Sequence, residues 1–191
     1  MNICVYGASS NTIDKEFIKK TEELGEMIAK RGHGLVYGGG AHGLMGAAAR
    51  GVYKNGGKIV GVAPRFFETD GALYENCSEF IYTTTMRERK QIMEDRSDAF
   101  IVTPGGVGTF EEFFEMLTLK QLGRHSKAIV IYNLCGYYDE MNNMIESAIE
   151  KNFMKDTCRQ LYKFFTDADK MLDYIENYKG EAIGAKYFKN I

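Results

Sequence analysis

Residues 103–112 read Thr-Pro-Gly-Gly-Val-Gly-Thr-Phe-Glu-Glu and place three glycines directly before two carboxylates. They follow a run of four apolar residues, 99–102, and lead into residues 110–122, where apolar side chains recur with helical spacing. This pattern predicts a strand, a glycine turn and the start of a helix. Glycine lets the backbone approach a ligand closely, and the unpaired N–H groups at a helix start attract an anion. The stretch is therefore predicted to bind an anionic group.

Glu111 and Glu112 are expected in the first turn of that helix. There the helix dipole favours the ionised carboxylate and lowers its pKa, which suits a group that stabilises a cation or accepts a proton. Alternatively, the two acids only complement the dipole, which is worth ~0.3–1 kcal/mol for each charge. Because the glycine spacing, a threonine and the carboxylates coincide at a strand end, we favour a functional site.

Two further turns rich in glycine or small residues follow predicted strands, at 7–10 and at 38–46. Residues 38–43 satisfy the dinucleotide pattern G-x-G-x-x-G, but the next strand ends at Ala63-Pro64 without the acidic residue that would hold a ribose hydroxyl. A phosphate cradle without a dinucleotide fits this segment better than a NAD site. The remaining alternative is a tight turn that packs a helix on a sheet.

A cationic segment, residues 87–90, precedes the strand that feeds the carboxylate turn. It is either a solvated helix face or a source of phosphate-binding cations, because arginine binds phosphate in a bidentate manner. His33, His42 and His125 share no metal-ligand spacing, so no metal is expected.

The order of elements predicts the fold. Apolar runs at 3–6, 35–37, 59–63, 80–83, 99–102 and 128–132 alternate with helical patterns at 14–31, 47–54, 86–97, 110–122, 138–151 and 167–178. Such alternation predicts one α/β domain over residues 1–191, with a doubly wound parallel sheet in a Rossmann-like three-layer αβα arrangement. The three turns would then share the carboxyl edge of the sheet. Residues 65–78 have no period and are expected to form a loop that covers the site, and Thr166 with Asp169 is expected to cap the last helix.

Composition limits the partners. A net charge of -2 gives no general attraction to nucleic acid or to an anionic membrane. No apolar run approaches the ~20 residues of a membrane span, and the four cysteines are too far apart to predict a zinc site or a disulfide framework. A cytoplasmic protein with small-molecule or protein partners is expected. Since helix 110–122 is apolar on two sides, it is also expected to contribute to a homodimer interface.

Three ordered motifs resemble those of one family. Residues 104–112 match P-G-G-x-G-T-x-x-E, residues 86–90 resemble M-H-x-R-K, and residues 37–46 resemble Y-G-G-G-x-x-G-L-M-G. These are signatures of the Lonely Guy family of cytokinin riboside 5′-monophosphate phosphoribohydrolases, long mislabelled as lysine decarboxylases. The similarity extends over residues 3–178. Two positions depart from the pattern: Arg87 stands where the family usually has histidine, and Ala8 where it usually has a second serine.

The resemblance implies hydrolysis of the N-glycosidic bond of a purine nucleoside 5′-monophosphate by a homodimer without a cofactor. It also implies that Arg89 and Glu112 are the catalytic pair. Periodicity alone does not distinguish Glu112 from Glu111. The natural substrate, AMP or an N6-prenylated nucleotide, is left open. The substrate-binding residues expected are Ser9, Gly39, Gly40, Gly43, Lys90, Gly105, Gly106, Val107, Gly108, Thr109, Phe110, Glu111 and Thr118.

Two other functions compete with this one. Related folds bind a nucleotide or a molybdopterin cofactor without cleaving it, so a non-catalytic binding or carrier protein is the main alternative. A pyridoxal-dependent lysine decarboxylase needs a lysine that forms a Schiff base with the cofactor, and no lysine in the sequence is marked for that role.

Overall fold

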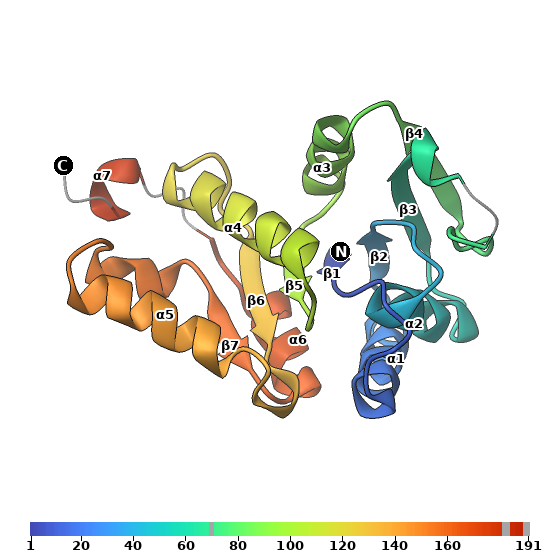
Figure 1. The fold of residues 1–191 in the computed structure, drawn as a ribbon, viewed down its shortest axis with the longest axis horizontal. Coiled ribbons are helices and arrows are strands. Elements are labelled where there is room, and N and C mark those ends of the chain that lie inside the picture. Colours follow the sequence, from blue (N-terminus) through green and yellow to red (C-terminus); the bar gives the residue numbers. More distant parts are fainter. Residues whose placement is uncertain (69–70, 181–183, 189–191) are drawn as a thin grey trace.

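The computed structural model describes residues 1–68, 71–180 and 184–188. Its centre is an all-parallel, seven-stranded sheet with the order β4-β3-β2-β1-β5-β6-β7 (Figure 1). The strands are β1 (Asn2–Tyr6), β2 (Gly34–Tyr37), β3 (Ile59–Pro64), β4 (Glu79–Thr83), β5 (Ala99–Val102), β6 (Ala128–Tyr132) and β7 (Lys163–Phe165).

Helices cover both faces of the sheet (Figure 1). One layer contains α1 (Lys15–Lys30), α2 (Gly43–Lys54) and α6 (Ala168–Asn177), and the other contains α3 (Met86–Asp95), α4 (Val107–Gln121) and α5 (Asp139–Glu150). Helix α7 (Ala185–Phe188) and the 3-10 turns η1 (Arg65–Phe67), η2 (Leu134–Gly136) and η3 (Asp156–Gln160) complete the described elements. The expected three-layer α/β fold is confirmed.

The central strand β1 explains why its sequence is apolar at successive positions. Ile3 and Val5 pack into the core under α1, α2 and α6, whereas Cys4 and Tyr6 pack into the core under α3, α4 and α5. A parallel strand covered by helices on both faces has no solvent side, so the apolar run does not alternate with polar residues. β1 pairs with β2 on one side and β5 on the other.

Helices α1 and α2 approach each other closely through glycine. A Cβ atom on Gly25 would lie 2.2 Å from the carbonyl oxygen of Ala48, and one on Gly51 would lie 2.1 Å from that of Glu22. Both contacts are with backbone and leave no room for a side chain. The start of α2 is held against the turn that follows β1 by a separate contact, in which Leu44 N donates to Ala8 O at 2.8 Å.

The order of strands reverses between β1 and β5, and ligands of doubly wound sheets bind outside the strand ends at such a switch point. The turns after these two strands are bonded to each other. Ala8 N donates to Pro104 O at 3.0 Å, and the Thr103 hydroxyl donates to Tyr6 O at 2.8 Å. The sheet therefore holds the first and third predicted turns side by side.

Two local predictions were wrong, and one strand was not predicted. Helix α4 begins at Val107 rather than Phe110, because the glycine-rich residues 106–108 already belong to the helix or its cap. The last helix is capped by Asp167, whose side chain accepts from Lys170 N at 2.9 Å, rather than by Thr166. Strand β7 was not predicted, since its three residues carry too short a pattern and pair only with β6. In the described part of the chain, no helix has the length and apolar character needed to cross a membrane.

Candidate active site

A cavity of about 560 Å³ opens at the switch point. Its wall is built from the turn after β1, the turn between β2 and α2, Phe67 with residues 72–73, the start of α3 and the start of α4. The elements that meet here are far apart in sequence, and the parallel sheet brings their ends to one edge. The lining residues are Gly7, Ala8, Ser9, Gly38, Gly40, His42, Met45, Phe67, Ala72, Leu73, Met86, Arg89, Gly106, Val107, Gly108, Thr109 and Glu112.

A buried ion pair lines this cavity. Arg89 Nη1 donates to Glu112 Oε1 at 2.7 Å, and Arg89 Nε donates to Val62 O at 3.1 Å. The exposed fractions are 6% for Arg89 and 8% for Glu112. Arginine has a rigid planar donor group, so two bonds from different nitrogens fix its orientation.

Two features of the sequence place the arginine. Helix α3 starts directly before it, and the Thr85 side chain caps this helix by accepting from Glu88 N at 3.1 Å. On the opposite side, a Cβ atom on residue 38 would lie only 2.0 Å from Arg89 Nη2. The position of the guanidinium therefore requires glycine at residue 38. The glycine pattern of the sequence did not reveal this contact between Gly38 and Arg89.

The expected low pKa of Glu112 was wrong. Burial raises the pKa of this carboxyl above its ordinary value, and the charge and hydrogen bond of Arg89 oppose the rise. Since α4 begins at Val107, Glu111 and Glu112 lie in its second turn, and the effect of the dipole falls off within the first turn. A buried carboxyl with a raised pKa is a better proton acceptor than an ordinary surface carboxylate.

The start of α4 offers free donors to the cavity. The cap residue Gly106 has no side chain to bond the first amides, and the N–H groups of Val107, Gly108 and Thr109 have no acceptor among the described residues. All four residues line the cavity. Backbone amides at a helix start with no internal partner are a binding site for an anionic oxygen.

The start of α2 differs, although its glycine pattern is denser. Leu44 N and Met45 N donate to Ala8 O at 2.8 and 3.2 Å, and Gly43 N donates to the Asn11 side chain at 3.0 Å. Gly43 has a φ of 58°, and a Cβ there would lie 2.4 Å from Ala8 O. These amides already donate to acceptors within the protein, so they are not free to bind an anion. The turn packs α2 on the sheet, and its residues Gly38, Gly40 and His42 line the cavity.

The expected site residues divide into two groups. Those brought together in the cavity are Arg89, Glu112, Ser9, Gly40, Gly106, Val107, Gly108 and Thr109. Those that do not line it are Gly39, Gly43, Lys90, Gly105, Phe110, Glu111 and Thr118.

The residues outside the cavity have other contacts. Lys90 forms ion pairs with Glu111 and with Glu115, the latter at 2.9 Å. Phe110 packs into the core, with its ring centroid 6.3 Å from that of Tyr138. Thr118 is exposed and lines a different hollow, beside Phe114 and Phe153.

Several apolar lining residues were not among the expected site residues: Met45 and Met86 lie within the family motifs, whereas Phe67 lies in none of them. The loop expected to cover the site does reach it: Ala41 N donates to Ala72 O at 3.0 Å, and Tyr74 N donates to Gly39 O at 2.9 Å. These bonds tie residues 72–74 to the turn after β2. Only the absence of periodicity in 65–78 pointed to this wall of the cavity, and it did not identify which residues would face inward.

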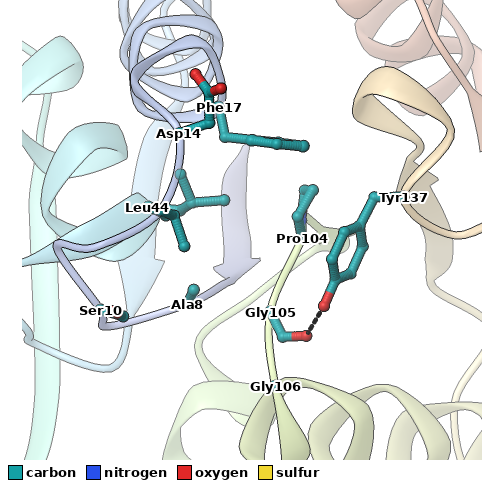
Figure 2. A pocket seen from close by; sticks show the side chains of 10 residues that line it. Ala8, Ser10, Asp14, Phe17, Leu44, Pro104, Gly105, Gly106 and Tyr137 are labelled. Atoms are coloured by element: carbon teal, nitrogen blue, oxygen red, sulfur yellow. Dashed lines mark hydrogen bonds between the residues drawn. The ribbon is translucent and has the colours of Figure 1, made fainter.

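A second cavity of about 280 Å³ borders the first and shares Ala8 and Gly106 with it. Figure 2 shows Phe17 and Tyr137 on either side of Pro104. The Tyr137 hydroxyl donates to Gly105 O at 2.7 Å (Figure 2). The buried Tyr138 hydroxyl donates to Thr103 O, also at 2.7 Å. Two consecutive tyrosines therefore hold the turn that precedes α4.

These tyrosines follow η2, a tight turn. Cys135, in its middle, is exposed and has a φ of 52°, and Gly136 has a φ of 71°. Asn133 supports the turn, because its side chain accepts from Tyr138 N at 2.7 Å and donates to Asp139 Oδ1 at 2.7 Å. No cluster of three or more His, Cys, Asp or Glu side chains suited to a metal ion occurs among the described residues.

A parallel sheet with a ligand cavity at its switch point defines a Rossmann-like α/β protein. Among solved structures, the molybdenum cofactor carrier protein of Chlamydomonas reinhardtii has a TM-score of 0.68 and 23% identity, with coverage of 92% of this chain and 95% of that one. The molybdenum cofactor binding protein of Rippkaea orientalis has a TM-score of 0.66 and 20% identity, with coverage of 92% and 93%. At these identities the likeness establishes the fold alone.

Sequence comparison identifies the family. A family model described as "possible lysine decarboxylase" matches residues 45–175. The cytokinin riboside 5′-monophosphate phosphoribohydrolase LOG2 of Arabidopsis thaliana is 35% identical over 176 residues, which is 92% of this chain and 83% of that protein. LOG3 of the same plant is 34% identical, with coverage of 92% and 82%. The chain belongs to the Lonely Guy (LOG) family.

Proposed function

We propose that the protein hydrolyses the N-glycosidic bond of a purine nucleoside 5′-monophosphate and releases the free base and ribose 5-phosphate. The observation that carries this proposal is the buried Arg89–Glu112 pair, which shares one cavity with the free amides of Val107, Gly108 and Thr109. The reaction is the one named for LOG2 and LOG3, the relatives at 35% and 34% identity.

The amides suit the phosphate. Three N–H donors at a helix start neutralise part of its charge, and they require no conformational change to do so. The loop ending in Leu73 and the side chains of Met45, Phe67 and Met86 provide an apolar wall on which a purine ring can pack. The nucleotide would thus be held at both ends, with the sugar between them.

Glu112 then acts at the anomeric carbon. Departure of a purine leaves positive charge on the ribose ring, which a nearby carboxylate stabilises. A water oxygen forms a bond to the anomeric carbon as the bond to the base nitrogen breaks, and Glu112 accepts the proton of that water. The departing base takes up a proton from solvent. The charge and hydrogen bond of Arg89 favour the ionised form of Glu112 against the effect of burial, and Arg89 also orients the substrate, which raises the rate through positioning.

Product analysis tests the proposal. The purified protein is incubated with AMP and with N6-substituted adenosine monophosphates, and released bases are separated by chromatography. Glu112→Gln is expected to lower turnover at least about a hundredfold while the nucleotide still binds, because a positioned general base contributes about that much or more. Glu111→Gln, on the exposed neighbour, is the matched control and should retain most activity.

Two outcomes would overturn the proposal. Near-normal turnover by Glu112→Gln would remove the assigned role of this carboxylate. Protection from thermal unfolding by AMP with no base released at high protein concentration would instead indicate a nucleotide-binding protein without hydrolytic activity.

We further propose that the protein acts as a homodimer that includes α4. Phe114 and Leu122 on this helix and its C-cap are about one-third exposed, at 36% and 37%, and Phe153 nearby is 83% exposed. Light scattering at micromolar concentration should give twice the 21.6 kDa chain mass. A monomer mass would count against the dimer without affecting the assignment of Glu112.

A further inference from the structure

Lys120 is a buried cation that the proposed reaction does not use. It lies in the last turn of α4, where its side chain has an exposed fraction of 7%. Its ammonium group stands 4.8 Å from the centre of the Tyr178 ring. The nitrogen is not fully enclosed, and none of the hydrogen bonds or ion pairs between described residues includes it. Buried charges in proteins are usually paired, so this environment calls for an explanation.

The side chain lines a cavity of about 200 Å³. The cavity is bounded by the end of α4, the end of η3, the residues that follow α6, and α7. It lies at the opposite end of α4 from the candidate active site: Lys120 follows Glu112 by eight residues, which corresponds to about 12 Å along a helix axis. The other lining residues are His125, Gln160, Leu161, Tyr178, Lys179 and Phe188.

The polar groups of this cavity are mainly donors. Lys120 and Lys179 supply ammonium groups and Gln160 supplies an amide, whereas no Asp or Glu side chain occurs among the described lining residues. His125 adds no charge, because burial lowers its pKa to about 4. Its ring is already engaged, with Nε2 donating to Met116 O at 2.9 Å and Nδ1 accepting from Lys127 N at 3.2 Å.

The helix dipole does not account for this arrangement. A lysine in the last turn of a helix interacts favourably with the negative end of the helix dipole. An exposed lysine would make the same interaction without the free-energy cost of burying its charge, so the dipole does not explain why Lys120 is buried. Burial lowers the pKa of Lys120 to about 8, so the amine is still mostly protonated at neutral pH. The site therefore carries a positive charge that the described side chains leave uncompensated.

We propose that the Lys120 cavity is a binding site for a small oxyanion, separate from the candidate active site. The ammonium group of Lys120 would hold the anion from within, with Lys179 and Gln160 at the exposed rim. Leu161 and Phe188 would contact an apolar portion of an organic acid. The ligand class is a sulfate, phosphate or carboxylate group small enough for about 200 Å³.

Residue-specific acetylation of the intact protein provides the first test. The extent of acetylation at each lysine is measured by peptide mass spectrometry in chloride and then at equal ionic strength in sulfate, phosphate or acetate. A bound anion raises the pKa of Lys120, and each unit of pKa lowers the reactive neutral fraction about tenfold. Lys120 should therefore react about tenfold more slowly with the anion, while the exposed Lys151 should not change. The acetate and phosphate arms distinguish a carboxylate site from a phosphate site.

Thermal unfolding of Lys120→Met provides a second test that does not depend on reagent access. In chloride the variant should unfold at a higher temperature than the wild type, because it removes a buried unpaired charge. Sulfate should stabilise the wild type more than the variant, since only the wild type keeps the site. Lys151→Met is the matched control, and it also corrects for the general stabilisation of folded proteins by sulfate.

The proposal fails if sulfate, phosphate and acetate stabilise the wild type and Lys120→Met equally. It also fails if acetylation of Lys120 proceeds at the same rate with and without these anions. If burial prevents acetylation altogether, the thermal comparison decides. Because Lys120 is remote from Glu112, none of these results depends on whether the protein hydrolyses nucleotides.

Discussion

The guanidinium of Arg89 is held by contacts on three sides. Glu112 accepts from one nitrogen, Val62 O accepts from a second, and Gly38 leaves space beside the third. A catalytic arginine acts through its position, and a displacement of about 1 Å costs about a hundredfold in rate. The proposed role of Arg89 therefore also requires the absence of a side chain at residue 38.

Gly38→Ala is expected to fold but to lose activity. The added Cβ would lie 2.0 Å from Arg89 Nη2, so the guanidinium must move away from Glu112. We expect kcat/KM for nucleotide hydrolysis to fall about a hundredfold. Gly184→Ala is the control, because a Cβ there has no neighbour within 4 Å in the described part of the chain. Unchanged kcat/KM in a folded Gly38→Ala protein would contradict the proposed positioning role of Arg89.

Residue-level prediction from sequence had a clear limit. The motif at 104–112 identified the glycine turn and both acids, and the family resemblance chose Glu112. The structure adds that Glu112 is buried and Glu111 exposed. Lys90, expected beside the ligand, forms ion pairs with Glu111 and Glu115, which the sequence did not predict. Side-chain partners across elements depend on packing, and a single sequence carries no direct record of that packing.

At the scale of elements, the turn before α4 depends on a loop more than 30 residues later. Tyr137 and Tyr138 each donate to a carbonyl of this turn, at 2.7 Å. Fixed carbonyls restrict the movement of this turn, which leads directly into Val107 and Gly108 at the start of α4. The tyrosines thus act as positioning residues for the proposed phosphate site.

Tyr137→Phe should weaken nucleotide binding more than it slows the reaction. The loss of one hydrogen bond of ~0.5–1.5 kcal/mol corresponds to about a two- to tenfold higher KM, with kcat nearly unchanged. Steady-state kinetics with AMP measures both values. Tyr187→Phe removes an exposed hydroxyl that is bonded to Gln160 at 3.3 Å, and it serves as the control. A lower kcat at unchanged KM would refute the positioning role.

Elements with long apolar patterns were predicted well. The strands around 3–6, 35–37, 59–63, 80–83, 99–102 and 128–132 and the six predicted helices occur where the pattern placed them, within a few residues. The start of α4 was misplaced because glycine disfavours a helix, so residues 106–108 were assigned to the turn. The structure shows that the helix nevertheless begins at Val107. β7 was missed because its three residues are defined by pairing with β6.

For the whole molecule, His125 links stability to pH. Burial lowers its pKa from 6.5 to about 4, so the folded protein keeps the ring neutral. Above pH 6.5 both the folded and the unfolded state hold it neutral. As the pH falls from 6.5 to about 4, the unfolded chain binds a proton that the folded chain does not bind, and stability is lost.

His125→Gln should therefore reduce the loss of stability between pH 6.5 and about 4. Urea midpoints at a series of pH values measure this slope, and other titrating groups cancel in the comparison with the wild type. His42→Gln, on an exposed residue outside the core, is the matched control. Parallel pH profiles for wild type and His125→Gln would exclude this histidine as the source.

The exposed Cys135 in η2 makes the turn before α4 accessible to spectroscopy without any mutation. Burial raises the pKa of Cys4 to about 12 and also raises that of Cys77, and Cys158 is buried, so these thiols react slowly with maleimides. A fluorophore would attach first at Cys135, two residues from Tyr137, whose hydroxyl bonds Gly105 O. Its emission would report nucleotide binding at the turn in real time, even for nucleotides that the protein does not cleave.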